Sequence, residues 1–137
     1  MDGTLVRGHA QALDVGPVRL GIAAIAQDEP RRLAIVCNEA RISYRELDEA
    51  SNGMALTFAR AGISYGDRVA VMCHNRPELF FAWNGAARLG ALVVPIGYRT
   101  TPDELAYLLE DSGAEALVHD RPEVVAQTCL LYTSRCV

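Results

Sequence analysis

Residues 66–96 read GDRVAVMCHNRPELFFAWNGAARLGALVVPI, and this stretch decides the fold class. The run from Val69 to Cys73 is apolar without interruption, which is typical of a strand covered on both faces, as in parallel sheets. Pro77 suits the first turn of a helix, which we expect to be deeply packed, with Trp83 in the core, and to end at Gly90. The run from residue 91 to residue 96 then predicts a second buried strand.

The same alternation continues downstream. Thr101 and Glu104 form a capping box that predicts a helix start, and Gly113 is placed to end that helix. Residues 116–119 predict a further strand, and Pro122 opens a last helix. Such a succession implies right-handed crossovers and a mostly parallel sheet flanked by helices. The predicted fold class is therefore α/β.

Upstream of residue 66 the pattern predicts smaller elements. We expect a helix that ends before Pro30 and a hairpin formed by residues 33–37 and 41–42. Ser43 and Glu46 form another capping box, which predicts the start of a long amphipathic helix.

The chain divides into three parts. Residues 1–16 are expected to be an amino-terminal extension, residues 17–126 the folded part, and residues 127–137 a non-native tail. The tail has no periodicity and holds two cysteines within eight positions. One possible coding of residues 129–134 resembles a transposon end used in preparing DNA libraries, so we expect that the native reading frame is lost near the start of the tail.

Composition and charge exclude several classes of function. The 137 residues carry a formal net charge of −4 and no basic run, which argues against a nucleic-acid partner. All 13 basic residues are arginine, which excludes a P-loop lysine, a Schiff-base lysine and a lysine general base. The start of the chain does not resemble a signal peptide and no apolar stretch is long enough for a membrane span, so we expect a cytoplasmic protein.

A serine-hydrolase motif is present but lies in the wrong context. Residues 62–66 match G-x-S-x-G, and the order Ser64, Asp111, His119 fits a catalytic triad. A nucleophile elbow needs a strand before the serine and a helix after it, whereas here a helix precedes and a strand follows. We therefore interpret the motif as a helix-to-strand turn.

Two residues are candidates for ligand binding. His74 follows one predicted strand and Arg99 follows the next, and open α/β sheets bind ligands beyond the carboxyl ends of their strands. A solvated turn and a surface arginine are the alternative interpretations. The histidines are scattered and show no metal-ligand spacing, so no metal site is predicted.

Two segments carry a family resemblance. ISYREL at residues 42–47 resembles the opening motif of the AMP-forming acyl-CoA synthetases, members of the adenylate-forming ligase superfamily, and ARLGALVVPIGYR at residues 87–99 resembles their second motif. The resemblance covers residues 17–126. Gly97 departs from the family, where asparagine is frequent, and this leaves the substrate subclass open.

The resemblance implies a ligase that uses ATP and magnesium to convert a carboxylic acid into an acyl-adenylate and then transfers the acyl group to coenzyme A. It also implies that this chain is the amino-terminal subdomain of such an enzyme. The ATP-binding loop and the catalytic lysine of the family are not in the sequence, so we expect the chain alone to bind no cofactor and to be inactive. His74 and Arg99 would then lie near the substrate or coenzyme A cleft.

Two alternatives stay open at this point. An adenylation domain of a peptide synthetase shares both motifs, and a stand-alone flavodoxin-like binding module would have the same fold class. The fragment hypothesis differs from the second because it predicts exposed apolar surface and self-association. The identity of the carboxylic acid does not follow from the sequence.

Overall fold

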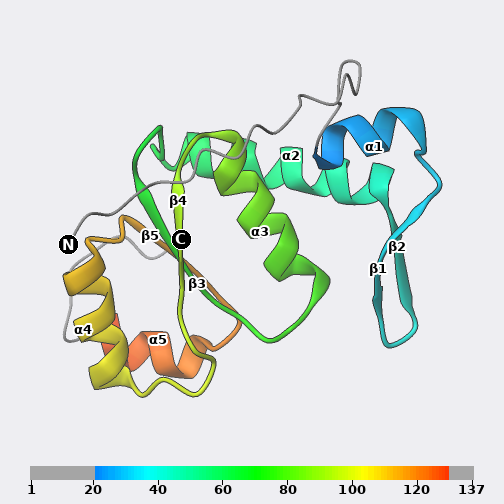
Figure 1. Cartoon of the computed structure of the whole chain (residues 1–137). Helices are drawn as coiled ribbons and strands as arrows, with labels where there is room; N and C mark the ends of the chain where they lie inside the picture. Colours follow the sequence, from blue (N-terminus) through cyan, green and yellow to red (C-terminus); the bar gives the residue numbers. More distant parts are fainter. Residues whose placement is uncertain (1–20, 130–137) are drawn as a thin grey trace, which may run out of the picture.

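The computed structural model describes residues 21–129, which form five helices and five strands (Figure 1). In chain order these elements are α1 (Ile22–Asp28), β1 (Leu33–Cys37), β2 (Ala40–Ser43), α2 (Tyr44–Arg60), β3 (Arg68–Met72), α3 (Pro77–Arg88), β4 (Leu92–Pro95), α4 (Pro102–Ser112), β5 (Ala116–His119) and α5 (Pro122–Cys129).

A three-stranded parallel sheet organises the fold. Its strand order is β4-β3-β5, and Val69 of β3 lies opposite Val93 on one side and Ala116 on the other. Strands β1 and β2 form a separate antiparallel hairpin. The predicted α/β class with a parallel sheet is confirmed.

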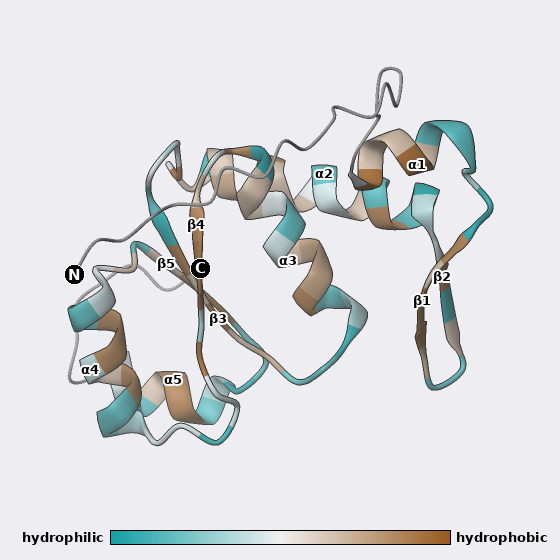
Figure 2. Ribbon diagram, in the orientation of Figure 1, coloured by the Kyte–Doolittle hydropathy of each residue, from teal (hydrophilic) through white to brown (hydrophobic). Residues whose placement is uncertain are grey.

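Helices cover both faces of this sheet. Side chains along a strand point alternately to opposite faces, and β3 accordingly supplies both cores. Val69 and Val71 pack with residues of α2 and α3, whereas Ala70 and Met72 pack with residues of α4 and α5. Figure 2 shows the apolar residues concentrated along the strands and along one side of each long helix.

Both predicted capping boxes are present. The Ser43 N–H donates to Glu46 Oε2 at 2.7 Å, and the Glu46 N–H donates back to Ser43 Oγ at 3.3 Å. Thr101 and Glu104 repeat the arrangement at 2.9 and 3.4 Å. Gly113 ends α4 with a φ of 62°, a left-handed conformation that favours glycine. Local sequence signals therefore fix where α2 and α4 begin.

The expected deep burial of the 77–90 helix and the 91–96 strand is wrong. Phe80 and Trp83 of α3 are 49% and 44% exposed, and Leu92 of β4 is 55% exposed. The physical reason is their position: β4 is an edge strand, and α3 contacts the sheet and α2 through one side only. That side is made of small buried residues, namely Ala82, Gly85 and Ala86.

The expected boundary between residues 126 and 127 falls inside a helix. α5 runs to Cys129, and Thr128 is buried, with its hydroxyl donating to Val124 O at 2.9 Å and to Pro102 O at 3.3 Å. The expected extension and residues 130–137 lie outside the described residues. The non-native tail stays a prediction.

Close contact between α2 and α3 depends on Gly85. A Cβ atom at this position would lie 2.8 Å from Met54 Cβ and 3.0 Å from Ala55 N. Arg88 of α3 also donates to Asp48 Oδ1 at 2.5 Å, which ties the same two helices together. There is no room for even a methyl group at residue 85 unless the helices separate.

We therefore predict that Gly85→Ala lowers the free energy of unfolding by about 1–3 kcal/mol, the usual cost of overpacking a core. The matched control is Gly53→Ala in the interior of α2, where a Cβ would meet no atom within 4 Å. This control should raise the free energy of unfolding by about 0.5–1 kcal/mol, because alanine is the better helix former. Urea unfolding measures both, and equal stability of the two variants would contradict the packing.

Candidate functional site

The carboxyl ends of the three parallel strands meet at one edge of the sheet, where side chains from three loops touch. His74 follows β3, Tyr98 follows β4, and Asp120 and Arg121 follow β5. We call these four residues the carboxyl-edge cluster. This is the edge at which open α/β sheets bind ligands.

Asp120 holds His74 by two hydrogen bonds to the same oxygen. His74 Nδ1 lies 2.8 Å from Asp120 Oδ2, and the His74 backbone N–H donates to that oxygen at 3.2 Å. An ionised carboxylate can only accept, so Nδ1 carries the ring proton. The His74 side chain is half exposed, whereas that of Asp120 is mostly buried.

Tyr98 links the other two loops. Its ring centroid lies 3.4 Å from that of His74, and the Arg121 guanidinium lies 5.0 Å from the same ring. Arg121 Nη1 also donates to the Tyr98 carbonyl at 2.8 Å. Each of the three loops is therefore bonded to or stacked on another, which fixes the shape of this edge.

Electrostatics keep Asp120 charged and Cys73 neutral. Burial by itself would raise the pKa of Asp120, but the hydrogen bonds from His74, together with the charges of His74 and Arg76, outweigh it and lower the pKa. Burial, reinforced by the charge of Asp120, raises the pKa of the Cys73 thiol. That thiol donates to Val118 O at 3.8 Å and is not an activated nucleophile.

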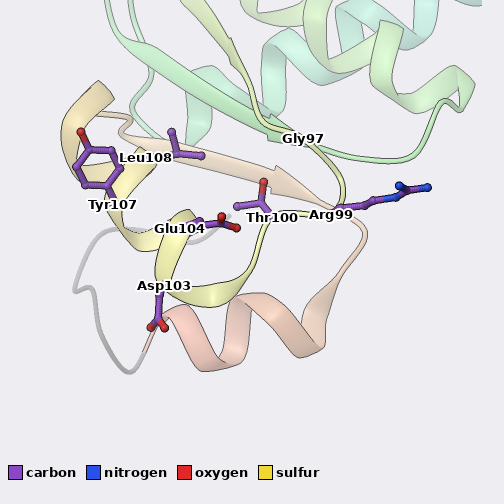
Figure 3. Close-up of a pocket in the computed structure, with 7 residues that line it drawn as sticks. All are labelled: Gly97, Arg99, Thr100, Asp103, Glu104, Tyr107 and Leu108. Atoms are coloured by element: carbon purple, nitrogen blue, oxygen red, sulfur yellow. The ribbon is translucent and has the colours of Figure 1, made fainter.

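Arg99 lies on the β4–α4 loop at a groove of about 650 Å³. Figure 3 shows its side chain pointing away from the other residues that line the groove, which are Gly97, Thr100, Asp103, Glu104, Tyr107 and Leu108. Within residues 21–129 no side chain pairs with its guanidinium. Arg99 is an exposed cation whose side chain points away from the carboxylates of Asp103 and Glu104.

The structure places the two predicted residues on neighbouring loops of one edge. They do not touch, although His74 stacks on Tyr98, the residue next to Arg99. Sequence reasoning missed Tyr98, Asp120 and Arg121. The position of Asp120 directly after the third predicted strand was the available signal, since the rule that selected His74 applies equally to that strand.

The G-x-S-x-G motif is a turn, as interpreted. Ser64 lies before the amino end of β3 and its hydroxyl donates to Asp67 at 2.9 Å. His119 ends β5, at the opposite edge of the parallel sheet. A five-residue strand spans roughly 16 Å, so these residues cannot form a triad.

Two kinds of feature do not occur within residues 21–129. No group of three or more His, Cys, Asp or Glu side chains is arranged to hold a metal ion. None of the helices in that range combines the length and the apolar character needed to cross a bilayer.

We predict that the stabilising contribution of Asp120 depends on pH. Because folding lowers the pKa of Asp120 below its ordinary value of about 3.9, the stabilisation is present above that value and is lost as the pH falls toward the folded-state pKa. The gap in unfolding free energy between wild type and Asp120→Asn should narrow from about pH 6 to about pH 3, as measured by urea unfolding. In a His74→Leu background the narrowing should be smaller, because one of the two hydrogen bonds is gone. A gap that does not vary with pH would rule out this role.

Comparisons with known proteins identify the family of this chain. A sequence profile of the AMP-binding enzyme family matches residues 22–134. A medium/long-chain-fatty-acid–CoA/3-oxocholest-4-en-26-oate–CoA ligase from Mycobacterium marinum is 34% identical over 108 residues, which cover 76% of this chain and 20% of that protein. The chain thus spans about a fifth of the length of the curated relatives it matches.

Solved structures agree. The N-terminal domain of FACL13 from Mycobacterium tuberculosis has a TM-score of 0.73 and 31% identity, covering 77% of this chain and 28% of that one. O-succinylbenzoate coenzyme A synthetase from Bacillus subtilis, in complex with AMP, has a TM-score of 0.76 and 26% identity, covering 85% and 30%. With a family match over most of its length and this shared architecture, the chain belongs to the AMP-binding enzyme family and has the fold of the amino-terminal subdomain of the adenylate-forming ligases.

Proposed function

We propose that the chain is the amino-terminal part of a cytoplasmic ATP-dependent, AMP-forming acid–thiol ligase, and that the parent enzyme is a fatty-acyl or related acyl-CoA synthetase. The family match over residues 22–134 carries the proposal. In the parent, ATP with magnesium supplies activation of the carboxylate as an acyl-adenylate, and coenzyme A accepts the acyl group.

The described residues do not fit a Mg·ATP site. A triphosphate is held by converging cations and backbone N–H groups, but Asp103, Glu104 and Asp120 bring negative charge to this edge, and Arg99 is its unpaired cation. The sequence has no lysine. We therefore propose that this chain is inactive alone.

The role of the chain is to position loops. The carboxyl-edge cluster ties three loops together and holds the half-exposed ring of His74 in place through Nδ1. The neighbouring loop presents the fixed positive charge of Arg99. We propose that these two groups border the cleft for the acid or coenzyme A.

The names of the relatives support a general class of substrate and no particular acid. The Mycobacterium marinum relative is named for fatty and steroid acids, and the Bacillus subtilis enzyme for O-succinylbenzoate. One is named as a CoA ligase and the other as a coenzyme A synthetase, which supports a carboxylic acid substrate and does not favour the peptide-synthetase alternative. A family match over most of the chain likewise does not favour an unrelated flavodoxin-like module.

Two activity measurements test the proposal. The purified chain should give no acid-dependent ATP–pyrophosphate exchange above background. A chimera in which residues 22–129 replace the matching segment of the Mycobacterium marinum ligase should form acyl-CoA, because the segment supplies the same scaffold. Exchange by the chain alone, or a folded chimera without activity, would contradict the proposal.

Within the chimera, Arg99→Ala should lower kcat/KM about tenfold, equivalent to the loss of one charged hydrogen bond of about 1.4 kcal/mol. Arg60→Ala, at the exposed end of α2, is the matched control and should leave kcat/KM unchanged. Equal effects of the two substitutions would remove Arg99 from the cleft.

We also propose that the chain alone self-associates through the exposed apolar side chains of α3. Phe80 and Trp83 lie one turn apart and are each nearly half exposed. Trp83→Arg should therefore shift the chain toward monomer in sedimentation velocity, whereas Gly53→Arg adds the same charge on α2 and should not. A wild-type chain that stays monomeric at high concentration would refute self-association.

A further inference from the structure

The amino-terminal part of the described chain forms regular structure but has no buried residue. It comprises α1, β1 and β2, and we call residues 21–43 the amino-terminal lobe. Every residue of this lobe is exposed or only partly buried, and the first buried residue of the described chain is Leu47 in α2. Helices and sheets are stable when they bury their apolar side, yet six large apolar side chains of the lobe stay outside the core: Ile22, Ile25, Leu33, Ile35, Val36 and Ile42.

The hairpin of the lobe has little support from the rest of the structure. Within residues 21–129, β1 and β2 pair only with each other, and Figure 1 shows them at one side of the molecule, away from the three-stranded sheet. A two-stranded hairpin by itself is marginally stable in water and needs a further strand or a packing partner. The described residues therefore supply only part of the cover that this hairpin requires.

A shift in register places two exposed apolar side chains on one face of the hairpin. Leu33 lies opposite Ser43, and the pairing shifts between Leu33 and Ile35, so that Val36 lies opposite Arg41. Cross-strand partners share a face, and so do Ser43 and Arg41, which are two positions apart. Leu33 and Val36 therefore lie on the same face, although residues three positions apart in a regular strand do not. They are 46% and 56% exposed.

This face matches an apolar partner. The Ser43 hydroxyl, which lies on it, already donates to Glu46 Oε2 at 2.7 Å in the capping box of α2. Arg41 carries the charge of the face and lies toward the turn of the hairpin. The surface formed by Leu33 and Val36 thus offers apolar contact and no polar group that lacks a partner.

The solved structures indicate what supplies the cover. The chain matches 28% of the N-terminal domain of FACL13, with 77% of its own length. A domain is built around a shared core, so the unmatched part of such a domain packs against surfaces that the matched part leaves open. The amino-terminal lobe is such a surface.

We propose that the face of the hairpin that carries Leu33 and Val36 is an interface with the part of the parent enzyme that follows residue 129, whose apolar side chains cover it. This inference rests on the proposed function, because it requires a parent enzyme longer than the chain. The lobe then contributes to a core that is complete only in the parent.

The test compares one double variant in two contexts, the full chain alone and the chimera with the Mycobacterium marinum ligase. Leu33→Thr combined with Val36→Thr keeps residues that suit a strand but adds two hydroxyls. In the chain alone the thermal unfolding midpoint should change by less than about 1 °C, because surface substitutions have small effects. In the chimera it should fall by at least about 3 °C, because the hydroxyls are buried without partners.

A positive control and a second measurement accompany this comparison. Leu105→Ala, in the core of this chain, should lower the midpoint in both contexts. Hydrogen exchange needs no substitution and so covers the case in which the double variant does not fold. The backbone N–H groups of residues 33–43 should exchange at least about tenfold more slowly in the chimera than in the chain alone.

The other outcomes overturn the inference. A midpoint lowered equally in both contexts would show that this chain already covers the face, and a midpoint lowered in neither, with equal exchange rates, would show that the face meets solvent in the parent. A midpoint of the chain alone that rises with protein concentration, but not in the double variant, would assign the face to a second copy. Acyl-CoA formation by the unsubstituted chimera reports separately on the proposed function.

Discussion

The burial of β3 on both faces and its pairing along both edges is the constraint on which the remaining structure depends. Val69 to Met72 have essentially no exposed surface, and successive side chains enter opposite cores. Helices must therefore cover both sides, and each connection from one strand to the next must cross over. Parallel strands joined in this way place all their carboxyl ends at one edge, which is why residues 46 positions apart, His74 and Asp120, become hydrogen-bonded neighbours.

Asp120 links the geometry of this edge to its electrostatics. Its Oδ2 accepts the hydrogen bonds of the His74 backbone and ring, and its Oδ1 is buried without a hydrogen-bond partner among the described residues. The hydrogen bonds from His74 lower the pKa of Asp120, so its carboxylate stays ionised to a lower pH than an ordinary aspartate. The same carboxylate therefore holds the loops after β3 and β5 together and places a negative charge at this edge of the sheet.

The sequence predicted those features whose causes are local. The capping boxes at Ser43 and Thr101 involve residues three positions apart, and the strands are apolar runs bounded by turns. It failed for Trp83 and Leu92, because an apolar side chain signals a tendency toward burial but does not say whether this chain supplies the cover. The Asp120–His74 pair was missed for a related reason: it depends on strand order, which a pattern along the chain does not contain.

The charged side chains at the carboxyl edge of the sheet favour the proposed positioning role over a catalytic one. A subdomain that had to hold a triphosphate would gather cations where its strands end, yet here the cations at that edge are largely committed. Arg76 pairs with Glu78, and Arg121 is held by Glu123 and the Tyr98 carbonyl, which leaves Arg99. Such a balance suits an edge that shapes loops and accepts hydrogen bonds. The charge of this edge, more than the fold that the chain shares with its relatives, is what supports the proposal of a positioning role.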